Sequence, residues 1–250
     1  MRKFGLIGYP LGHSFSQKYF SEKFKREKIC ECTYENFPMK EIESLPGLIY
    51  SDSEICGLNV TIPYKTEILR FIDETDEAVK EIGAANVLKI KREEGAVRLF
   101  GYNSDIEGVK ESLRPLSGVK GGKALILGTG GGSRAVAWTL GKMGFEVILV
   151  SRRKSNGILR YNEVSSEILA DTDLIVNATP IGMNPHADGM PEIDYSLLDE
   201  HHTLFDLVYN PEMTSFLKMG QERGCRIITG IKMLYSQAER SWEIWNDDRL

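Results

Sequence analysis

The sequence is poor in cysteine and histidine, and it contains no long apolar run. Its four cysteines are scattered and show no Cys-x-x-Cys spacing: Cys30, Cys32, Cys56 and Cys225. This argues against a zinc site or a disulfide framework and favours reduced thiols in the cytoplasm. No segment approaches the roughly 18 apolar residues of a membrane span, and the N-terminal apolar run is too short for a signal peptide. We therefore expect a cytoplasmic protein without a membrane partner.

An excess of basic residues is also lacking. The chain has 31 Lys and Arg against 36 Asp and Glu, which gives a net charge of −5 and a pI near 5.6. Proteins that bind nucleic acids usually carry a strongly basic surface, so we expect no nucleic-acid partner. The 250 residues, of which 42% are apolar, suit one large or two modest globular domains.

The first part of the chain mixes strands and helices. Apolar, β-branched runs predict strands at 3–10, 32–39 and 55–65. Helices are expected at about 16–27 and at 66–83, the second amphipathic and closed by Gly83. Residues 84–105 read as a hairpin whose turn is 91–95. This pattern predicts one compact α/β unit.

A regular alternation of strand and helix begins near Gly121. Strands are expected at 123–128, 145–152, 201–211 and 225–230, and 164–180 reads as a helix followed by a strand. Such an alternation predicts a doubly wound parallel sheet. The last segment, 231–248, is helical, and we expect it to return to the first domain. The predicted division is therefore 1–108 with 230–250, and 109–229.

The glycine cluster GTGGGSRA at 128–135 lies between a predicted strand and a predicted helix. Gly128 allows a tight turn, and Gly130 and Gly131 put no Cβ between the backbone and a pyrophosphate. Ala135 permits close packing of the helix on the strand. The helix N-terminus then offers N–H groups to an anion. A tight turn without a ligand is the alternative.

Four polar or cationic residues end the next predicted strand: Ser151, Arg152, Arg153 and Lys154. A fold that prefers NAD usually has an acidic residue at this place to hold the ribose 2′-hydroxyl. Guanidinium groups instead bind a phosphate in bidentate fashion. The cluster therefore favours NADP over NAD, and a solvated basic turn is the alternative.

Three polar stretches in the first part are candidates for substrate chemistry. GYPLGHSFSQ carries Ser14 and Ser16, whose hydroxyls could bind a carboxylate or simply cap a helix. NVTIPYK carries Thr61 and Lys65, and the lysine is either a proton donor or a solvated cation. GYNSDIEG places Asp105 in a polar turn, where it could equally be an acid in the first turn of a helix.

These stretches, taken with others, strongly resemble the motifs of the shikimate dehydrogenase family. The first part matches through HSFSQ, NVTIPYK, GAANV and GYNSDIEG, and the second through GTGGGSRA, SRR, NATPIGM and the pair Gly230 and Gln237. Eight motifs in the family's order, from about residue 5 to 245, are far more specific than any single one. The resemblance implies an N-terminal α/β substrate domain, a Rossmann-like NADP-binding domain and a cleft between them.

The resemblance also implies a role for each matching residue. Lys65 would be the general acid and base, and Asp105 would pair with it. The substrate would be held by Ser14, Ser16, Thr61, Asn86, Tyr209 and Gln237. The NADP pyrophosphate would lie on Gly128, Thr129, Gly130, Gly131 and Gly132, the 2′-phosphate on Ser151, Arg152, Arg153 and Lys154, and the nicotinamide beside Leu207 and Gly230. No metal is implied, and the sequence suggests no cluster of ligands.

The chain departs from the family pattern at three positions: Gln17 stands where proline is usual, and Val87 and Ser104 stand where threonine is usual. The main expectation is an NADP-dependent shikimate dehydrogenase that reversibly reduces 3-dehydroshikimate, as a monomer or homodimer. A quinate/shikimate dehydrogenase with mixed cofactor use is an alternative. A non-catalytic dinucleotide-binding regulator is another, although Lys65 and Asp105 argue against it.

Overall fold

The computed structural model describes residues 1–11, 14–93, 95–116, 121–153 and 155–247. The chain forms two compact units, Met1–Ser104 with Ala238–Leu250, and Asp105–Gln237. The first boundary lies at the start of helix α4 (Asp105–Leu113), and the second lies within helix α8 (Gly230–Asn246). The sequence-based division put these boundaries at 108/109 and 229/230. Each unit has its own six-stranded sheet.

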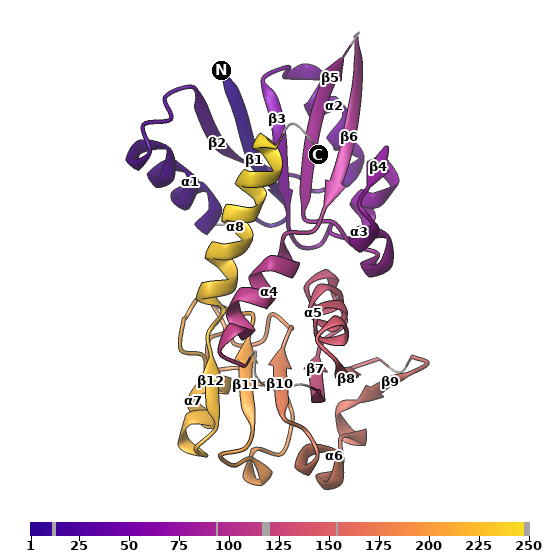
Figure 1. Cartoon of the computed structure of the whole chain (residues 1–250), viewed down its shortest axis with the longest axis vertical. Coiled ribbons are helices and arrows are strands. Elements are labelled where there is room, and N and C mark those ends of the chain that lie inside the picture. Colours follow the sequence, from indigo (N-terminus) through magenta and orange to yellow (C-terminus); the bar gives the residue numbers. More distant parts are fainter. Residues whose placement is uncertain (12–13, 94, 117–120, 154, 248–250) are drawn as a thin grey trace. The chain divides into compact units, whose positions relative to one another are not determined.

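The sheet of the first unit has the order β2-β1-β3-β5-β6-β4 (Figure 1). β1 pairs in parallel with both β2 and β3, and the hairpin β5–β6 adds to β3 in antiparallel fashion. The predicted hairpin at 84–105 is therefore present. The strands are β1 (Arg2–Gly8), β2 (Cys32–Pro38), β3 (Ile55–Val60), β4 (Glu74–Thr75), β5 (Val87–Glu93) and β6 (Ala96–Tyr102).

The helix predicted at 66–83 is wrong, because this segment folds as three short elements. They are the 3-10 helix η2 (Glu67–Phe71), strand β4 and helix α3 (Glu77–Ile82). Asp73 is bonded to the backbone of Leu99 in β6 through both its own backbone N–H and its carboxylate. Asp76 then caps α3 by accepting from the Val79 N–H, and Gly83, with φ of 67°, ends it. The remaining helices are α1 (Phe15–Arg26), η1 (Ile42–Ser44) and α2 (Leu45–Ser51).

The C-terminal part of α8 completes an apolar cluster of the first unit. Trp245 is buried and stacks on Phe4, with 4.7 Å between the ring centroids. Its indole N–H donates to the Leu88 carbonyl across 2.9 Å. Gly57 makes room for the indole, since a Cβ on Gly57 would lie 2.3 Å from Trp245 Nε1. The C-terminal part of α8 is thus part of the core of the first unit.

The sheet of the second unit has the order β12-β11-β10-β7-β8-β9, and its strands are parallel (Figure 1). The chain starts in the middle at β7, winds outward to β9 and then returns to the other side at β10. This confirms the predicted doubly wound sheet. The strands are β7 (Gly122–Leu127), β8 (Phe145–Ser151), β9 (Ile158–Arg160), β10 (Leu174–Asn177), β11 (Thr203–Asp206) and β12 (Arg226–Ile228).

Helix α5 (Gly131–Lys142) joins β7 to β8 and packs through Val136 and Leu140 on β7 residues Ala124 and Ile126. The strand order reverses between β7 and β10, and ligands of such sheets bind beside the carboxyl ends of the strands at that point. The other helices are η3 (Arg114–Leu116), η4 (Tyr161–Glu163), α6 (Ser166–Ala170), η5 (Tyr195–Leu197) and α7 (Ser215–Glu222). None of the helices in the described ranges is both long enough and apolar enough to span a membrane.

Candidate active site

The glycine loop joins the carboxyl end of β7 to helix α5. Gly128 has φ of 113°, and a Cβ on it would lie 3.0 Å from the Ala178 carbonyl oxygen, so the turn requires glycine. Its carbonyl accepts from the Ser133 hydroxyl across 2.6 Å. Gly130 caps α5 with an ordinary φ of −75°, and a Cβ there would meet nothing within 4 Å. The loop thus begins with a turn that requires glycine, and the space beside Gly130 at the helix N-terminus is open.

The cationic turn at the end of β8 lines a pocket with the same loop. The pocket measures about 460 Å³, and it is lined by Thr129, Ser151, Arg152 and Arg153. The Ser151 hydroxyl accepts from the Arg153 N–H across 3.3 Å, which fixes the turn. Both arginines are exposed, and Lys154 lies outside the described residues. The second unit therefore brings the predicted 2′-phosphate residues next to one of the predicted pyrophosphate residues.

Leu207 and Gly230 also lie together in the second unit. A Cβ on Gly132 would be 3.5 Å from Leu207 Cδ2, so Leu207 reaches the glycine loop. A Cβ on Gly230 would lie 2.8 to 2.9 Å from the carbonyl oxygens of Asp206, Leu207 and Val208. Only glycine allows α8 to begin this close to the turn that carries Leu207.

A buried carboxylate, which no sequence motif indicated, holds that turn in place. The fully buried Asp206 accepts from the Val208 N–H at 2.9 Å, the Asn177 amide at 3.0 Å and the Thr214 hydroxyl at 2.6 Å. Burial raises the pKa of Asp206 to about 6, against the lowering effect of these three hydrogen bonds. Tyr209 follows three residues later and is half-buried, and burial raises its pKa as well.

Asp105 and Gln237 belong to two helices that pack on each other. Asp105 is the first residue of α4 and is 3% exposed. A Cβ on Gly108 would lie 2.7 Å from the Met233 carbonyl oxygen and 3.4 Å from Gln237 Cβ, so α4 and α8 touch one turn beyond Asp105. Gln237 donates to the Leu234 carbonyl across 3.0 Å. The carboxylate lies in the first turn of its helix, where the helix dipole favours a negative charge.

In the first unit, the loop after β3 brings Thr61 and Lys65 beside Asn86. The Ala85 N–H donates to the Lys65 carbonyl, and the Val60 N–H donates to the Asn86 carbonyl, both across 2.8 Å. Lys65 is half-buried, and Asn86 is buried with 2% exposure. Three of the predicted substrate-side residues therefore come from two adjacent backbone segments.

A chain of buried polar side chains holds Asn86 from behind. Its amide donates to the Ser104 hydroxyl at 3.0 Å and accepts from the Ser104 N–H at 2.7 Å. The Ser104 hydroxyl lies 3.1 Å from that of Ser241, which accepts from Asn59 at 2.9 Å. Asn59 in turn accepts from Tyr34 at 2.9 Å, and the Tyr34 hydroxyl, whose pKa is raised by burial, accepts a hydrogen bond from the Ser16 hydroxyl. Ser16 and Asn86 are thus connected through the interior of the unit.

The structure explains the three departures from the family pattern. The Gln17 N–H donates to the Ser14 hydroxyl at 3.4 Å and completes the cap of α1, a bond that proline could not make. Ser104 keeps the hydroxyl that contacts Asn86. Val87 is fully buried in the apolar cluster around Phe4, so the methyl group that replaces a hydroxyl is packed against other apolar groups.

Each unit therefore gathers its own part of the predicted set. The first unit holds the residues assigned to the substrate at Ser14, Ser16, Thr61, Lys65 and Asn86, and the second holds Asp105, Tyr209, Gln237 and the cofactor residues. Sequence reasoning missed Asn59, Ser241 and Asp206. Asn59 stands at the start of the NVTIPYK motif, but the sequence reading assigned no role to it.

Comparisons with known proteins point in one direction. The sequence profile of the shikimate dehydrogenase substrate binding domain matches residues 6–88. A curated relative from Carboxydothermus hydrogenoformans, named shikimate dehydrogenase (NADP(+)), is 36% identical over 96% of this chain and 90% of its own length.

Solved structures agree in fold over nearly the whole chain. Shikimate dehydrogenase 1 from Peptoclostridium difficile is 36% identical, with a TM-score of 0.85 over 100% of this chain and 93% of that one. A shikimate 5-dehydrogenase from Thermus thermophilus, solved in complex with NADP(H) and shikimate, is 30% identical, with a TM-score of 0.84 over 98% of this chain and 94% of that one.

Proposed function

Because this chain belongs to the shikimate dehydrogenase family, we propose that it catalyses the reversible NADP-dependent reduction of 3-dehydroshikimate to shikimate, with Lys65 and Asp105 handling the proton. The observation that carries this function is the likeness to a curated NADP-dependent shikimate dehydrogenase, 36% identical over 96% of the chain. The chain is accordingly an oxidoreductase, and its cofactor is NADP.

The residues of the second unit fit this cofactor. The open space in front of Gly130 leaves the N–H groups at the start of α5 accessible to a pyrophosphate. Arg152 and Arg153 in the adjoining pocket supply positive charge for a 2′-phosphate, with Thr129 and Ser151 as hydroxyl partners. An NAD-preferring site would place a carboxylate here instead.

The chemistry follows from the residue types. NADPH, when bound, supplies the hydride that reduces the substrate carbonyl. Negative charge develops on the carbonyl oxygen, and the Lys65 ammonium stabilises it and donates a proton. Asp105 is assigned the carboxylate that shares this proton. In the oxidative direction Lys65 accepts the proton from the substrate hydroxyl.

Substrate binding is assigned to residues that their surroundings already fix. Asn86 is held by two bonds to Ser104, so little side-chain entropy is lost when it contacts the ring hydroxyls together with Thr61 and Gln237. Ser14 and Ser16 lie in or beside the first turn of α1, where the helix dipole favours the substrate carboxylate. Tyr209 is the further carboxylate partner.

The proposed function is tested by following NADP reduction in the presence of shikimate, and then of quinate. We expect turnover with shikimate and NADP. Activity should be much weaker when quinate replaces shikimate or when NAD replaces NADP. Equal activity with quinate would instead identify a quinate/shikimate dehydrogenase. A purified, folded protein that binds NADP but turns over neither compound would indicate a regulator.

Assembly and location are also proposals. We propose a monomer or homodimer in the cytoplasm, in keeping with the scattered cysteines, which are free thiols in the structure. Light scattering after gel filtration gives the mass in solution, and fractionation of the source cells gives the location. A tetramer, or activity found in an extracytoplasmic fraction, would overturn the corresponding part.

A further inference from the structure

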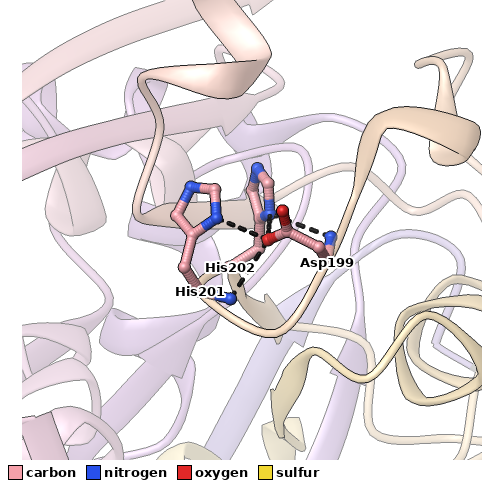
Figure 2. A group of neighbouring side chains, drawn as sticks. All are labelled: Asp199, His201 and His202. Atoms are coloured by element: carbon pink, nitrogen blue, oxygen red, sulfur yellow. Dashed lines mark hydrogen bonds and ion pairs between the residues drawn. The ribbon is translucent and has the colours of Figure 1, made fainter.

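A second group of polar side chains lies at the amino end of β11, away from the residues assigned to NADP. Within the described part of the chain, Asp199, His201 and His202 bring one carboxylate oxygen and two ring nitrogens within 4.8 Å of one another (Figure 2). Leu207 follows the opposite, carboxyl end of the same strand. The group therefore has no part in the proposed reaction.

The hydrogen bonds of His202 define which of its nitrogens carries a proton. The side chain is fully buried, and Nε2 lies 3.0 Å from the Leu169 carbonyl oxygen. A carbonyl oxygen only accepts, so Nε2 must be the donor. In the neutral ring Nδ1 then carries a lone pair, which accepts a hydrogen bond from the Asp199 N–H at 3.1 Å.

The same lone pair faces a second acceptor. Asp199 Oδ1 lies 3.0 Å from His202 Nδ1, and it also contacts His201 Nδ1 (Figure 2). Two acceptors at this distance repel each other unless a proton or a metal ion lies between them. A proton on Nδ1 could be donated to the Asp199 carboxylate, but it would then lie against a second donor, the Asp199 N–H. A cation bound by both groups removes the conflict with the carboxylate.

We propose that Asp199, His201 and His202 bind one divalent transition-metal ion through the carboxylate and the two Nδ1 atoms. Two imidazoles and a carboxylate form a common ligand set of zinc, with a remaining position for water. The bond from His202 Nε2 to the Leu169 carbonyl is the outer contact that usually fixes a metal-binding histidine.

Metal binding at this group requires a small change of one distance and the loss of one hydrogen bond. Ligands of a tetrahedral zinc ion lie about 3.4 Å apart when each bond is about 2.1 Å. The contact between Asp199 and His202 must therefore open by a few tenths of an ångström, and the Asp199 N–H must give up its bond to Nδ1. Asp199 is 61% exposed and His201 is 45% exposed, so both can move, while His202 stays fixed by burial.

The ion would connect several elements of the second unit. Through His202 it would join the loop before β11 to Leu169 in α6, and the His202 carbonyl accepts from the Arg226 N–H of β12 across 3.0 Å. Because binding occurs only in the folded unit, the ion should raise the melting temperature. Turnover of shikimate should not change.

The test uses the full chain without an affinity tag, stripped with a chelator and titrated with Zn²⁺ against a chromogenic competitor. We expect one ion per chain, and binding weakened by about tenfold or more in His201→Ala and in Asp199→Asn. His186→Ala is the matched control, because His186 is exposed and outside the group. The Zn²⁺ affinity of His186→Ala should equal that of the unmodified chain. Zn²⁺ should raise the melting temperature only of the chains that bind it.

Co²⁺ distinguishes this site from binding to the free cysteines. Ligation by nitrogen and oxygen gives no thiolate charge-transfer band, so the expected Co²⁺ spectrum lacks one. A thiolate band, or equal Zn²⁺ affinity in His201→Ala and the unmodified chain, would overturn the proposal. So would an unmodified chain that binds no ion, in which case the group is only a hydrogen-bonded turn.

Discussion

Arg152 and Arg153 are both exposed and line the pocket beside the glycine loop. We predict that replacing both by alanine raises the KM for NADP by about 10- to 100-fold, which corresponds to the loss of one charge-assisted hydrogen bond. The KM for NAD should not change, because NAD has no 2′-phosphate. Steady-state kinetics with each cofactor measures both values.

Arg160 is the matched control for this change. It is exposed and lies outside the pocket-lining residues. Arg160→Ala should leave both KM values as they are. An equal rise of the KM for NADP and the KM for NAD in the double variant would show that the arginines stabilise the loop and do not bind the 2′-phosphate.

Asp206 should make stability depend on pH. Burial raises its pKa to about 6 from an ordinary value of 3.8. The folded protein therefore binds a proton that the unfolded chain has released between these values, and stability falls as the pH rises through this window. A shift of about two pKa units corresponds to about 3 kcal/mol. Burial raises the pKa of Tyr195, and the charge of Asp206 adds to this effect.

Asp206→Asn isolates this effect, because asparagine keeps the size of the side chain and cannot ionise. Its Oδ1 can still accept from Val208, and the Thr214 hydroxyl can turn to accept from the new amide. We predict that the difference in unfolding free energy between the two proteins changes by about 2 kcal/mol from pH 4 to about 6.5, to the disadvantage of the unmodified chain. Urea unfolding of both proteins measures this difference, and a difference that is the same at all pH values would contradict the prediction.

Single residues were predictable where a motif carries them. Lys65, Asp105 and the glycines stand at fixed places in short patterns, so the sequence alone indicated them. The bond between Asn59 and Ser241 could not be found in this way, because 182 positions separate the two residues before folding brings their side chains to 2.9 Å. His202 was equally hidden, since an adjacent pair of histidines beside acidic residues gives no sign that one ring is buried.

In the loop from β7 to α5, glycine is needed at one position for the backbone conformation and at another for the open space beside it. Gly128 has a φ that favours glycine and a crowded Cβ position, whereas Gly130 has an ordinary φ and open space. We predict that Gly130→Ala lowers stability by no more than about 1 kcal/mol and weakens NADP binding by about tenfold, because the methyl group occupies the phosphate's place. Calorimetry and urea unfolding measure the two effects.

Gly128→Ala is the comparison variant. Its strained backbone and its contact with Ala178 should lower stability by about 1–3 kcal/mol before any ligand is added. If Gly130→Ala bound NADP as tightly as the unmodified chain, the space in front of α5 would not be the pyrophosphate site.

Sequence patterns predicted most elements because apolar runs and turn residues act locally. Strands such as β7 and β8 are largely apolar segments that begin at or just after a glycine, so they were easy to recognise, whereas β9 was not predicted. Residues 66–83 failed because their helical periodicity competes with pairing to a distant strand. The bonds between Asp73 and Leu99, 26 positions apart, decide that competition, and no window of the sequence contains both partners.

At the scale of the whole molecule, one helix serves both units. The segment from Gly230 to Gln237 belongs to the second unit, and the remainder of α8 belongs to the first. A truncation before Gly230 would therefore remove Trp245 from the core of the first unit together with Gln237. A point substitution at Gln237 is the cleaner test of its role in binding the substrate.

The assignments divide the chemistry between the units, with Lys65 in the first and Asp105 and the cofactor residues in the second. The direct test is kcat for shikimate oxidation in Lys65→Met, which keeps the apolar stem and removes the ammonium. The dissociation constant for shikimate, measured by calorimetry, is the control for binding. Asp105→Asn should give a decrease of the same kind.

We predict that Lys65→Met lowers kcat by about 10²- to 10⁴-fold, the usual contribution of a general acid or base, while shikimate still binds. A kcat close to that of the unmodified enzyme, with the protein folded and saturated, would contradict the account.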